Sequence, residues 1–375
     1  METQWVLFDV PEVCHYALLV PLIEGRFRSA LHPGENGHVM LCAESGSSLV
    51  KGHSFEALAY IHVSDNPYTL FKEAFTAIRV HLNSFRLLEE KTLPPLVDRF
   101  GWCTWDAFYL TVEPAGIWRG VKEFLEAGIP PRFLIIDDGW QSINMDGENP
   151  KECARNLVLG GEQMTARLYS FEEGERFMNY KAGSLLKNDA AHFDPMKPKL
   201  LINKAIEIER ALKEEGSGVS QAKIEGLKRE LKDLFGEQGG NEMDSASGEG
   251  GLSAFTKDMR TRFKGLDDIY VWHALCGAWG GVRTGSTHLD AKNHLHKAFP
   301  GLDGTMDDLA VIKIVEGGIG LVHPDQACDF YNSMHSYLSK AGVTGAKIDV
   351  IQALEYVGEE YGGRVELERG PITRA

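Results

Sequence analysis

The 375-residue sequence contains few cysteines, and none of them is paired in a short motif. A zinc site usually shows closely spaced CxxC pairs, and a small disulfide scaffold has a much higher density of cysteine. The spacing here fits neither class, so we expect reduced thiols in an intracellular protein. The six cysteines are Cys14, Cys42, Cys103, Cys153, Cys276 and Cys328.

Positive charge is also scarce. Lysine and arginine number 39 against 54 aspartates and glutamates, which gives a formal net charge of -15. Nucleic acids and anionic membranes attract basic proteins, so this balance argues against both as partners. A neutral substrate fits the charge better.

Long apolar runs are missing as well. No stretch approaches the roughly 18–20 residues that span a bilayer. Pro11, Glu12 and His15 interrupt the most apolar stretch near the start, so it does not resemble a secretory leader. We expect a soluble, cytoplasmic protein without membrane partners. Its length suffices for two domains, or for one large domain with a long insertion.

The first part of the chain alternates short β-like runs with Gly, Pro, Asn and Ser, as is typical of an all-β domain or part of one. Pro67 then opens a helical pattern, and Leu93, Pro94 and Pro95 close the region as a linker. We therefore expect a first domain over residues 1–93. Its predicted strands cover residues 5–10, 16–23, 38–42 and 57–63.

From residue 94 to residue 375 the rhythm changes to strand, turn and helix. Residues 99–105 are a predicted strand, Pro114 starts a helix that ends at Gly128, and residues 133–136 are the next strand. This order predicts a βαβ unit and an α/β domain. Two further strands are predicted at residues 269–275 and 343–350, and two further helices at residues 306–316 and 325–341.

An unusually long connection, residues 187–252, separates the second and third of these strands. Apolar residues recur there at amphipathic helical spacing among many Lys and Glu residues. Residues 216–251 hold much Gly, Ser and Glu, a composition that packs poorly. We interpret the connection as an insertion; the simpler alternative is a solvated helical hairpin with no function of its own.

The most informative stretch is residues 133–140, FLIIDDGW, in which a short apolar run stops at two adjacent carboxylates. The run is too short for a helix and is bounded by Pro131 and Gly139, so we expect a buried strand. Acidic groups at the C-terminal end of a parallel strand usually face a pocket. Asp137 and Asp138 are therefore candidate site residues, although a pair that merely capped the turn would look the same.

Tryptophans gather at the predicted strand ends. Indole faces stack on the apolar C–H faces of sugar rings, and carboxylates bind pairs of hydroxyls. Tryptophan beside aspartate therefore predicts a carbohydrate pocket. The tryptophans are Trp102 and Trp105 after the first strand, Trp140 after the second, and Trp272 and Trp279 in and after the third.

The fourth predicted strand ends in Lys347 and Asp349, which a period of two places on the same side. A lysine beside a carboxylate favours the ionised form that a nucleophilic aspartate requires. A structural ion pair inside the fold would leave the same pattern, so the pair alone does not decide between the two roles.

Four ordered motifs resemble the plant raffinose-family galactosyltransferases and alkaline α-galactosidases, a group that includes raffinose synthases and seed imbibition proteins. They are residues 100–109 (FGWCTWDAFY), 136–142 (IDDGWQS), 271–275 (VWHAL) with 279–282 (WGGV), and 347–351 (KIDVI). Residues 156–167 (NLVLGGEQMTAR) and the long insertion resemble the stachyose-forming members in particular.

The resemblance implies an α/β fold, a (β/α)8 TIM-type barrel preceded by a β-sandwich. It implies retaining transfer of galactose from galactinol to an acceptor sugar, raffinose for the stachyose-forming members, with no metal or organic cofactor. By position in the motifs, Asp349 matches the nucleophile. Lys347, Asp137 and Asp138 match groups that hold the galactose hydroxyls. The aromatic walls of the pocket are matched by Trp105 and Trp279.

The sequence also departs from the family pattern. Only about four of the eight barrel strands can be counted, and the last residues, 368–375, do not resemble the family. The resemblance would place the acid/base aspartate in the other half, so no residue here is assigned that role. We expect a truncated chain with part of a β-sandwich and half a barrel. The alternatives are a galactinol–sucrose galactosyltransferase, an α-galactosidase with water as acceptor, or an inactive remnant.

Overall fold

The computed structural model describes residues 3–146, 164–187, 193–213, 220–235, 250–294 and 317–369. They form two compact units. Unit 1 is built from the described residues up to Val97 and from Leu354 onward, and unit 2 from those between Asp98 and Ala353. The expected domain limits, 1–93 and 94–375, assign the C-terminal residues to the second domain instead, and they stay a prediction.

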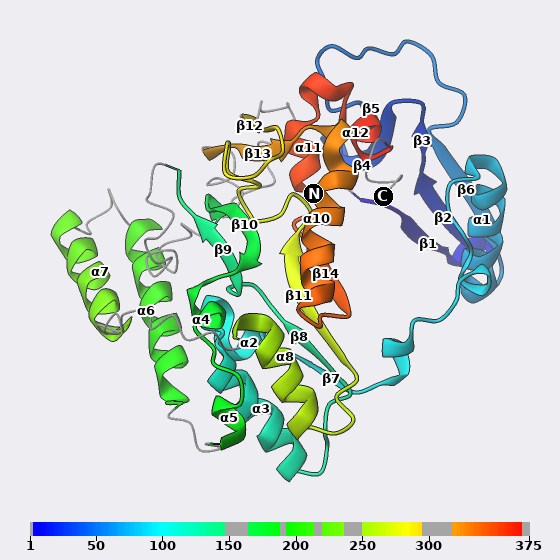
Figure 1. The fold of residues 1–375 in the computed structure, drawn as a ribbon. Coiled ribbons are helices and arrows are strands. Elements are labelled where there is room, and N and C mark those ends of the chain that lie inside the picture. The colour runs from blue at the N-terminus through cyan, green and yellow to red at the C-terminus, as the bar shows by residue number, and fades with distance from the viewer. Residues whose placement is uncertain are drawn as a thin grey trace. The chain divides into compact units, whose positions relative to one another are not determined.

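Unit 1 contains two three-stranded antiparallel sheets (Figure 1). The first has the order β1-β2-β6, with strands Val6–Val10, His15–Pro21 and Ala59–Ser64. The second has the order β3-β4-β5, with strands Ile23–Glu24, Phe27–Pro33 and Val39–Glu44. The predicted β-rich character of this region is confirmed, but the sequence patterns missed β4.

Helix α1, Pro67–Leu82, packs on the first sheet of unit 1. It begins where the Asn66 side chain accepts hydrogen bonds from the next two free backbone N–H groups, and it ends at Asn83 in a left-handed conformation. Its apolar stripe faces β2, so the predicted helix after Pro67 is confirmed. The buried residues of this core are Leu18, Val20, Leu22, Leu70, Ala74 and Ile78.

The centre of unit 2 is a four-stranded parallel sheet with the order β14-β11-β8-β7. Its strands are Gly101–Cys103 (β7), Phe133–Ile136 (β8), Asp268–Ala274 (β11) and Gly345–Asp349 (β14). All four predicted strands are confirmed, each to within a few residues. Because they run parallel, their C-terminal ends meet at one edge of the sheet.

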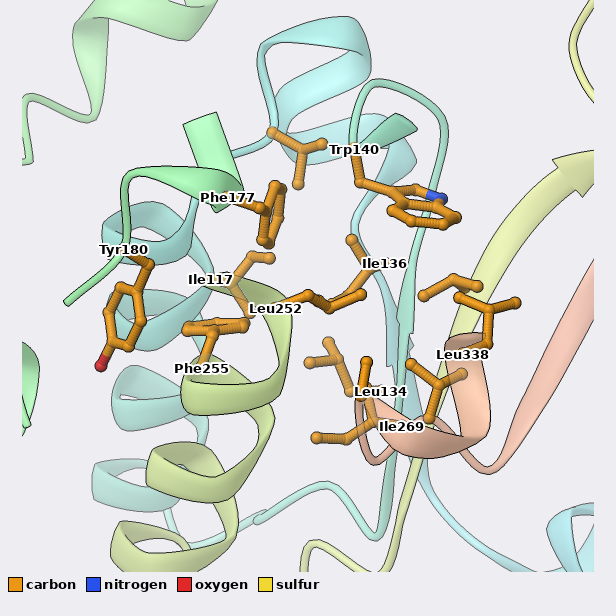
Figure 2. Close-up of a cluster of buried hydrophobic side chains, with 14 of the residues drawn as sticks. Ile117, Leu134, Ile136, Trp140, Phe177, Tyr180, Leu252, Phe255, Ile269 and Leu338 are labelled. Carbon is orange, nitrogen blue, oxygen red and sulfur yellow. The ribbon is translucent and has the colours of Figure 1, made fainter. Parts of the chain in front are cut away.

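Three helices cover one face of this sheet: α3 (Pro114–Glu126), α8 (Gly251–Arg262) and α10 (Ala327–Lys340). Figure 2 shows their apolar side chains meeting those of the strands in a continuous core. Ile117 and Phe255, for example, pack with Leu134, Ile136 and Ile269. Alternation along the strands turns every second side chain to the opposite face of the sheet, where polar groups can lie.

Smaller elements complete unit 2. Two antiparallel strand pairs follow the sheet strands, β9 with β10 (Gln141–Asn144, Arg167–Glu173) and β12 with β13 (Ala291–His294, Ile319–Val322). The short helices are α2 (Trp105–Phe108), α4 (Glu175–Met178) and α5 (Ser184–Lys187). Helices α11 (Ala353–Val357) and α12 (Arg364–Arg369) come after β14 and, from Leu354 onward, belong to unit 1.

The long connection contains two helices that lie side by side, α6 (Met196–Lys213) and α7 (Gln221–Phe235) (Figure 1). They share a small apolar core that includes Ile208, Ile224 and Leu231. The predicted helical character of residues 187–252 is thus confirmed where the structure describes it. The predicted helix at residues 306–316 lies outside the described residues.

Of the helices in the described part of the chain, none combines the length and the apolar character that crossing a membrane requires.

Candidate functional site

The two carboxylates after β8 sit in a tight turn that the sequence fixes. Gly139 has a φ of +108°, and a Cβ atom there would lie 2.7 Å from the Leu110 carbonyl oxygen, so only glycine fits. The backbone N–H of Asp137 donates to Thr104 Oγ1 at 3.0 Å, and that of Asp138 donates to Asp137 Oδ1 at 2.9 Å. Both aspartates are 2% exposed, so they are held inside the fold instead of capping a surface turn.

Asp137 is the centre of a polar contact across three strands. Its Oδ2 accepts hydrogen bonds from Lys347 Nζ at 2.7 Å and from Cys103 Sγ at 2.9 Å. Burial opposes the charge of Lys347, but the hydrogen bond and charge of Asp137 raise its pKa overall. Burial and the nearby Asp137 raise the pKa of Cys103 to about 11, so the thiol stays protonated and donates. A fixed ion pair therefore lies on the polar face of the sheet.

Asp138 lies in a different environment from its neighbour. Trp279 Nε1 donates to its Oδ2 at 2.8 Å. Burial raises the pKa of Asp138 to about 7; the charges of Asp137 and Asp349 add to the rise, and hydrogen bonds from Trp279 and the Gly139 N–H oppose it. This carboxyl therefore changes its charge near neutral pH.

Asp349 is held at the end of β14 by two donors. Trp272 Nε1 donates to Oδ2 at 3.0 Å, and the backbone N–H of Val350 donates to Oδ1 at 2.8 Å. Val350 has a φ of 54°, a left-handed conformation that is rare for a β-branched residue and is a form of strain often found at functional sites. The carboxylate is thereby oriented while remaining partly exposed.

Two indoles form the wall beside these carboxylates. The rings of Trp272 and Trp279 stack with centroids 6.2 Å apart and an interplanar angle of 27°. Trp140 Nε1 donates to the Trp272 carbonyl at 2.7 Å, which ties the turn after β8 to β11. Trp105 lies on α2, where its ring packs against that of Tyr109, with the ring centroids 4.9 Å apart.

The structure thus brings most of the predicted site residues into one network. Lys347 contacts Asp137, Trp279 contacts Asp138, and Asp349 is linked to them through the stacked indoles. Trp105 joins it only through its backbone, which hydrogen-bonds to Cys103, because the ring contact described for it is with Tyr109. The roles assigned to all six residues stay predictions.

Sequence reasoning missed three members of the network. It treated Cys103 only as a reduced thiol, passed over Thr104, and noted Trp272 only as one of several aromatics. A signal for Trp272 was present, because alternation and pairing place it directly beside Lys347 on the same face. No comparable signal marks Cys103, whose contact depends on the register of β7 against β8.

The arrangement suits a ligand rich in hydroxyl groups. Carboxylate oxygens accept from hydroxyls, Lys347 Nζ donates to them, and stacked indoles offer an apolar wall. Asp349, partly exposed and oriented by two donors, can act as a nucleophile. Within the described ranges, no three His, Cys, Asp or Glu side chains converge in a way that would hold a metal ion.

Comparisons with known proteins agree with this chemistry. Stachyose synthase from Pisum sativum is 56% identical over 380 residues, covering 98% of this chain and 44% of the relative. The probable galactinol–sucrose galactosyltransferase 4 from Arabidopsis thaliana is 58% identical over 383 residues, with 98% and 44% covered. Galactinol–sucrose galactosyltransferase from Pisum sativum is 41% identical over 373 residues, with 98% and 39% covered.

The chain therefore spans less than half the length of the relatives it matches. The profile of the family described as raffinose synthase or seed imbibition protein Sip1 matches residues 1–371. The chain belongs to this raffinose synthase and seed imbibition protein family.

Proposed function

We propose that the enzyme represented by this chain transfers galactose from galactinol to raffinose, forming stachyose. The observation that carries this proposal is the geometry at Asp349, whose two carboxylate oxygens are each held by a donor beside the Asp137–Lys347 pair. Asp137, Asp138 and Lys347 bind the galactose hydroxyls. The indole of Trp279, together with Trp105, forms the wall against which the sugar ring packs.

The proposed reaction is a double displacement with retention. An Asp349 oxygen attacks the anomeric carbon of galactinol, the bond to inositol oxygen breaks, and inositol leaves with a proton from a carboxylic acid. The acceptor hydroxyl then loses its proton to the same group and displaces Asp349. Retaining enzymes keep the two carboxyl groups about 5–5.5 Å apart. We assign the acid/base role to none of the described residues, since Asp137 and Asp138 bind the galactose hydroxyls in this proposal.

The proposed architecture is a (β/α)8 barrel preceded by a β-sandwich. The parallel order β14-β11-β8-β7 and the helices on one face support four consecutive β/α units of such a barrel. The two antiparallel sheets of unit 1 support the sandwich. Catalytic groups at the C-terminal strand ends fit the usual position of active sites in this fold.

Sucrose is the second candidate for the acceptor. A stachyose synthase and a probable galactinol–sucrose galactosyltransferase match this chain at 56% and 58% identity, so both acceptors are supported by similar relatives. The two reactions share the first displacement, and product analysis separates them. Stachyose indicates raffinose as the acceptor, raffinose indicates sucrose, and free galactose indicates hydrolysis.

A donor that needs no acid tests the role of Asp349 directly. In α-galactosyl fluoride the fluoride ion leaves without a proton, so the first displacement requires only the nucleophile. We expect one galactosyl group attached to Asp349, detected by intact mass and peptide mapping. With galactinol, whose inositol must be protonated, we expect no turnover by this 375-residue chain.

The control is Asp349→Asn, which keeps the size of the side chain and should abolish labelling. Asp137→Asn should weaken galactose binding about 10- to 150-fold, through lost charge-assisted hydrogen bonds of roughly 1.5–3 kcal/mol. A chain that binds galactose but stays unlabelled, or a label that persists in the Asp349→Asn variant, would contradict the proposal.

A further inference from the structure

Arg167 is a buried cation that the proposed reaction does not use. It is the first residue of β10, within unit 2, and it is only 2% exposed. It also closes the motif at residues 156–167, of which the structure describes the end from residue 164. A charge held this far from water needs close partners, so the contacts of its side chain indicate its role.

The guanidinium of Arg167 binds mainly to backbone carbonyl groups. Nη1 donates to the carbonyl oxygen of Gly280 and, at 3.4 Å, to that of Gly318, and Nη2 donates to that of Gly317 at 2.8 Å. Nε donates to Asp146 Oδ2 at 2.8 Å, although that carboxylate is 57% exposed. The planar fork of arginine suits this position because it serves several acceptors at once. The side chain therefore ties the start of β10 to two other segments of the chain.

The backbone at Gly280 links the start of β10 to β13. On one side, the Gly280 N–H donates to the Ala166 carbonyl at 2.9 Å; on the other, the Gly320 N–H donates to the Gly280 carbonyl at 2.8 Å. Gly281 has a φ of +81°, and a Cβ there would lie 2.2 Å from the Gly320 carbonyl oxygen, so the segments cross too closely for a side chain. Arg167 thus adds a second donor to a carbonyl at the centre of this crossing.

Trp279 directly precedes the crossing, so the position of its indole depends on where Gly280 lies. Its Nε1 donates to Asp138 Oδ2 at 2.8 Å, and its ring stacks on that of Trp272. Trp272 in turn donates to Asp349 Oδ2 at 3.0 Å. Neighbouring Cα atoms are a fixed 3.8 Å apart, so a displacement of the crossing moves this indole as well.

We infer that Arg167 is a positioning residue: it holds Gly280 in place and thereby orients the Trp279 indole toward Asp138. It acts at a distance, because the hydrogen bonds given above end on Asp146 and on three glycine carbonyls. A merely structural arginine would stabilise unit 2 without affecting the indole. The consequence for galactose binding rests on the proposed function, whereas the placement of the indole does not.

The first test measures the indole without any sugar. Stacked indoles such as Trp272 and Trp279 couple their transitions, and Trp279→Phe defines their couplet in the far-UV circular dichroism spectrum of the full chain. We expect Arg167→Met to lose most of this couplet. The matched control is Arg283→Met, which removes a hydrogen bond to Asn144 in the same part of unit 2 and should leave the couplet unchanged.

Arg167→Lys keeps the test decisive if the methionine variant does not fold. Lysine retains the charge but loses the planar fork, so it can serve fewer of the three carbonyls. We expect a partial loss of the couplet, smaller than in Arg167→Met, while cooperative unfolding in urea is retained. A native couplet in Arg167→Lys, together with a failure of Arg167→Met to fold, would assign Arg167 a structural role only.

The second test is a double-mutant cycle on galactose affinity, measured by calorimetry. Arg167→Met and Trp279→Phe should each weaken binding about tenfold, the effect of about one lost hydrogen bond. The double variant should bind no more weakly than either single variant, because both changes act through the same indole. Arg283→Met should bind galactose with native affinity.

The two tests separate this inference from the proposed function. If the native chain binds no galactose, the proposed function fails, and the couplet still decides whether Arg167 positions Trp279. The inference is overturned if Arg167→Met folds and keeps the native couplet, or if Arg283→Met loses as much of it. It is also overturned if the two tenfold losses multiply to about a hundredfold in the double variant.

Discussion

The two units each contain a cluster of buried or half-buried charges, and the clusters are built differently. The clamp cluster of unit 1 consists of Arg28, Glu44, Glu355 and Arg364, two cations in direct contact with two anions. Glu368 lies next to it, where burial and the charge of Glu355 raise its pKa and the two arginines oppose the rise. Arg364 contacts Glu44 at 2.7 Å and Glu355 at 3.3 Å, and Arg28 also binds Glu355 through both of its terminal nitrogens. Each charge has a partner of opposite sign.

The strand-end cluster of unit 2 consists of Asp137, Asp138, Lys347 and Asp349, three anions against one cation. Its single lysine is committed to Asp137. Burial is the main cause of the raised pKa of about 7 at Asp138, and the negative charges of Asp137 and Asp349 add to it. The structure therefore maintains an unfavourable arrangement of charge that a ligand with hydroxyl donors could relieve.

The difference separates a structural role from a functional one. A set of paired charges around one buried arginine holds parts of the fold together, here strands β4 and β5 and the residues after Leu354. An unbalanced set with a perturbed pKa at the ends of strands is the usual mark of a site. Three substitutions test this distinction.

Arg364→Met should have the largest effect, because it removes the arginine that Glu44 contacts and leaves Glu355 with Arg28 alone. Arg364 is 2% exposed, and removing one partner of a buried ion pair typically costs about 3–5 kcal/mol. We expect a loss of this size in the free energy of unfolding, measured by urea denaturation. The control is Arg369→Met, which removes an exposed hydrogen bond to the Gly25 carbonyl and should cost less than about 1 kcal/mol. Equal losses in the two variants would show that the clamp cluster contributes little.

Asp138→Asn should act on the dependence of stability on pH. The pKa of Asp138 is raised from 3.8 to about 7 in the folded state, so its contribution to stability is complete below pH 3.8 and is lost as the pH rises through 7. Relative to the native protein, the variant should therefore gain about 2–4 kcal/mol between pH 4 and pH 8. His273, whose pKa is lowered to about 4 mainly by burial, gives the opposite slope but is common to both proteins.

Urea denaturation at a series of pH values measures this difference. Glu355→Gln in the clamp cluster provides the comparison, since it removes a carboxylate that is paired with arginines. A constant difference between native protein and Asp138→Asn across this pH range would mean that Asp138 is not held in an unfavourable charged state. The distinction between the clusters would then fail.

Much of the strand-end cluster could be predicted from sequence because local patterns encode it. The run before Asp137 is too short for a helix and stops at acids, and alternation alone puts Lys347 and Asp349 on one face. Both features depend on neighbouring residues only. The four strands and the carboxylates that follow them were accordingly found without knowledge of the fold.

The clamp cluster could not be found in this way. Arg28 and Glu355 are 327 positions apart, and nothing local indicates that the residues after β14 belong with unit 1. β4, which contributes Arg28, was missed because Arg28, Ser29 and His32 interrupt its apolar residues. Contacts made at long range depend on tertiary packing, which propensity does not record.

Trp272→Phe should have the smallest effect and sharpens the functional side of the comparison. Phenylalanine keeps an aromatic ring beside Trp279 but removes the Nε1–H that donates to Asp349 at 3.0 Å. If Trp272 orients the nucleophile and does not bind the sugar, the rate of labelling by α-galactosyl fluoride should fall about tenfold, equivalent to about 1.4 kcal/mol, with unchanged galactose affinity. Trp5→Phe, at an exposed indole in unit 1, should leave both quantities unchanged. A loss of affinity without a change in rate would instead make Trp272 part of the pocket wall, and the orientation of Asp349 would then rest on the Val350 N–H alone among the described donors.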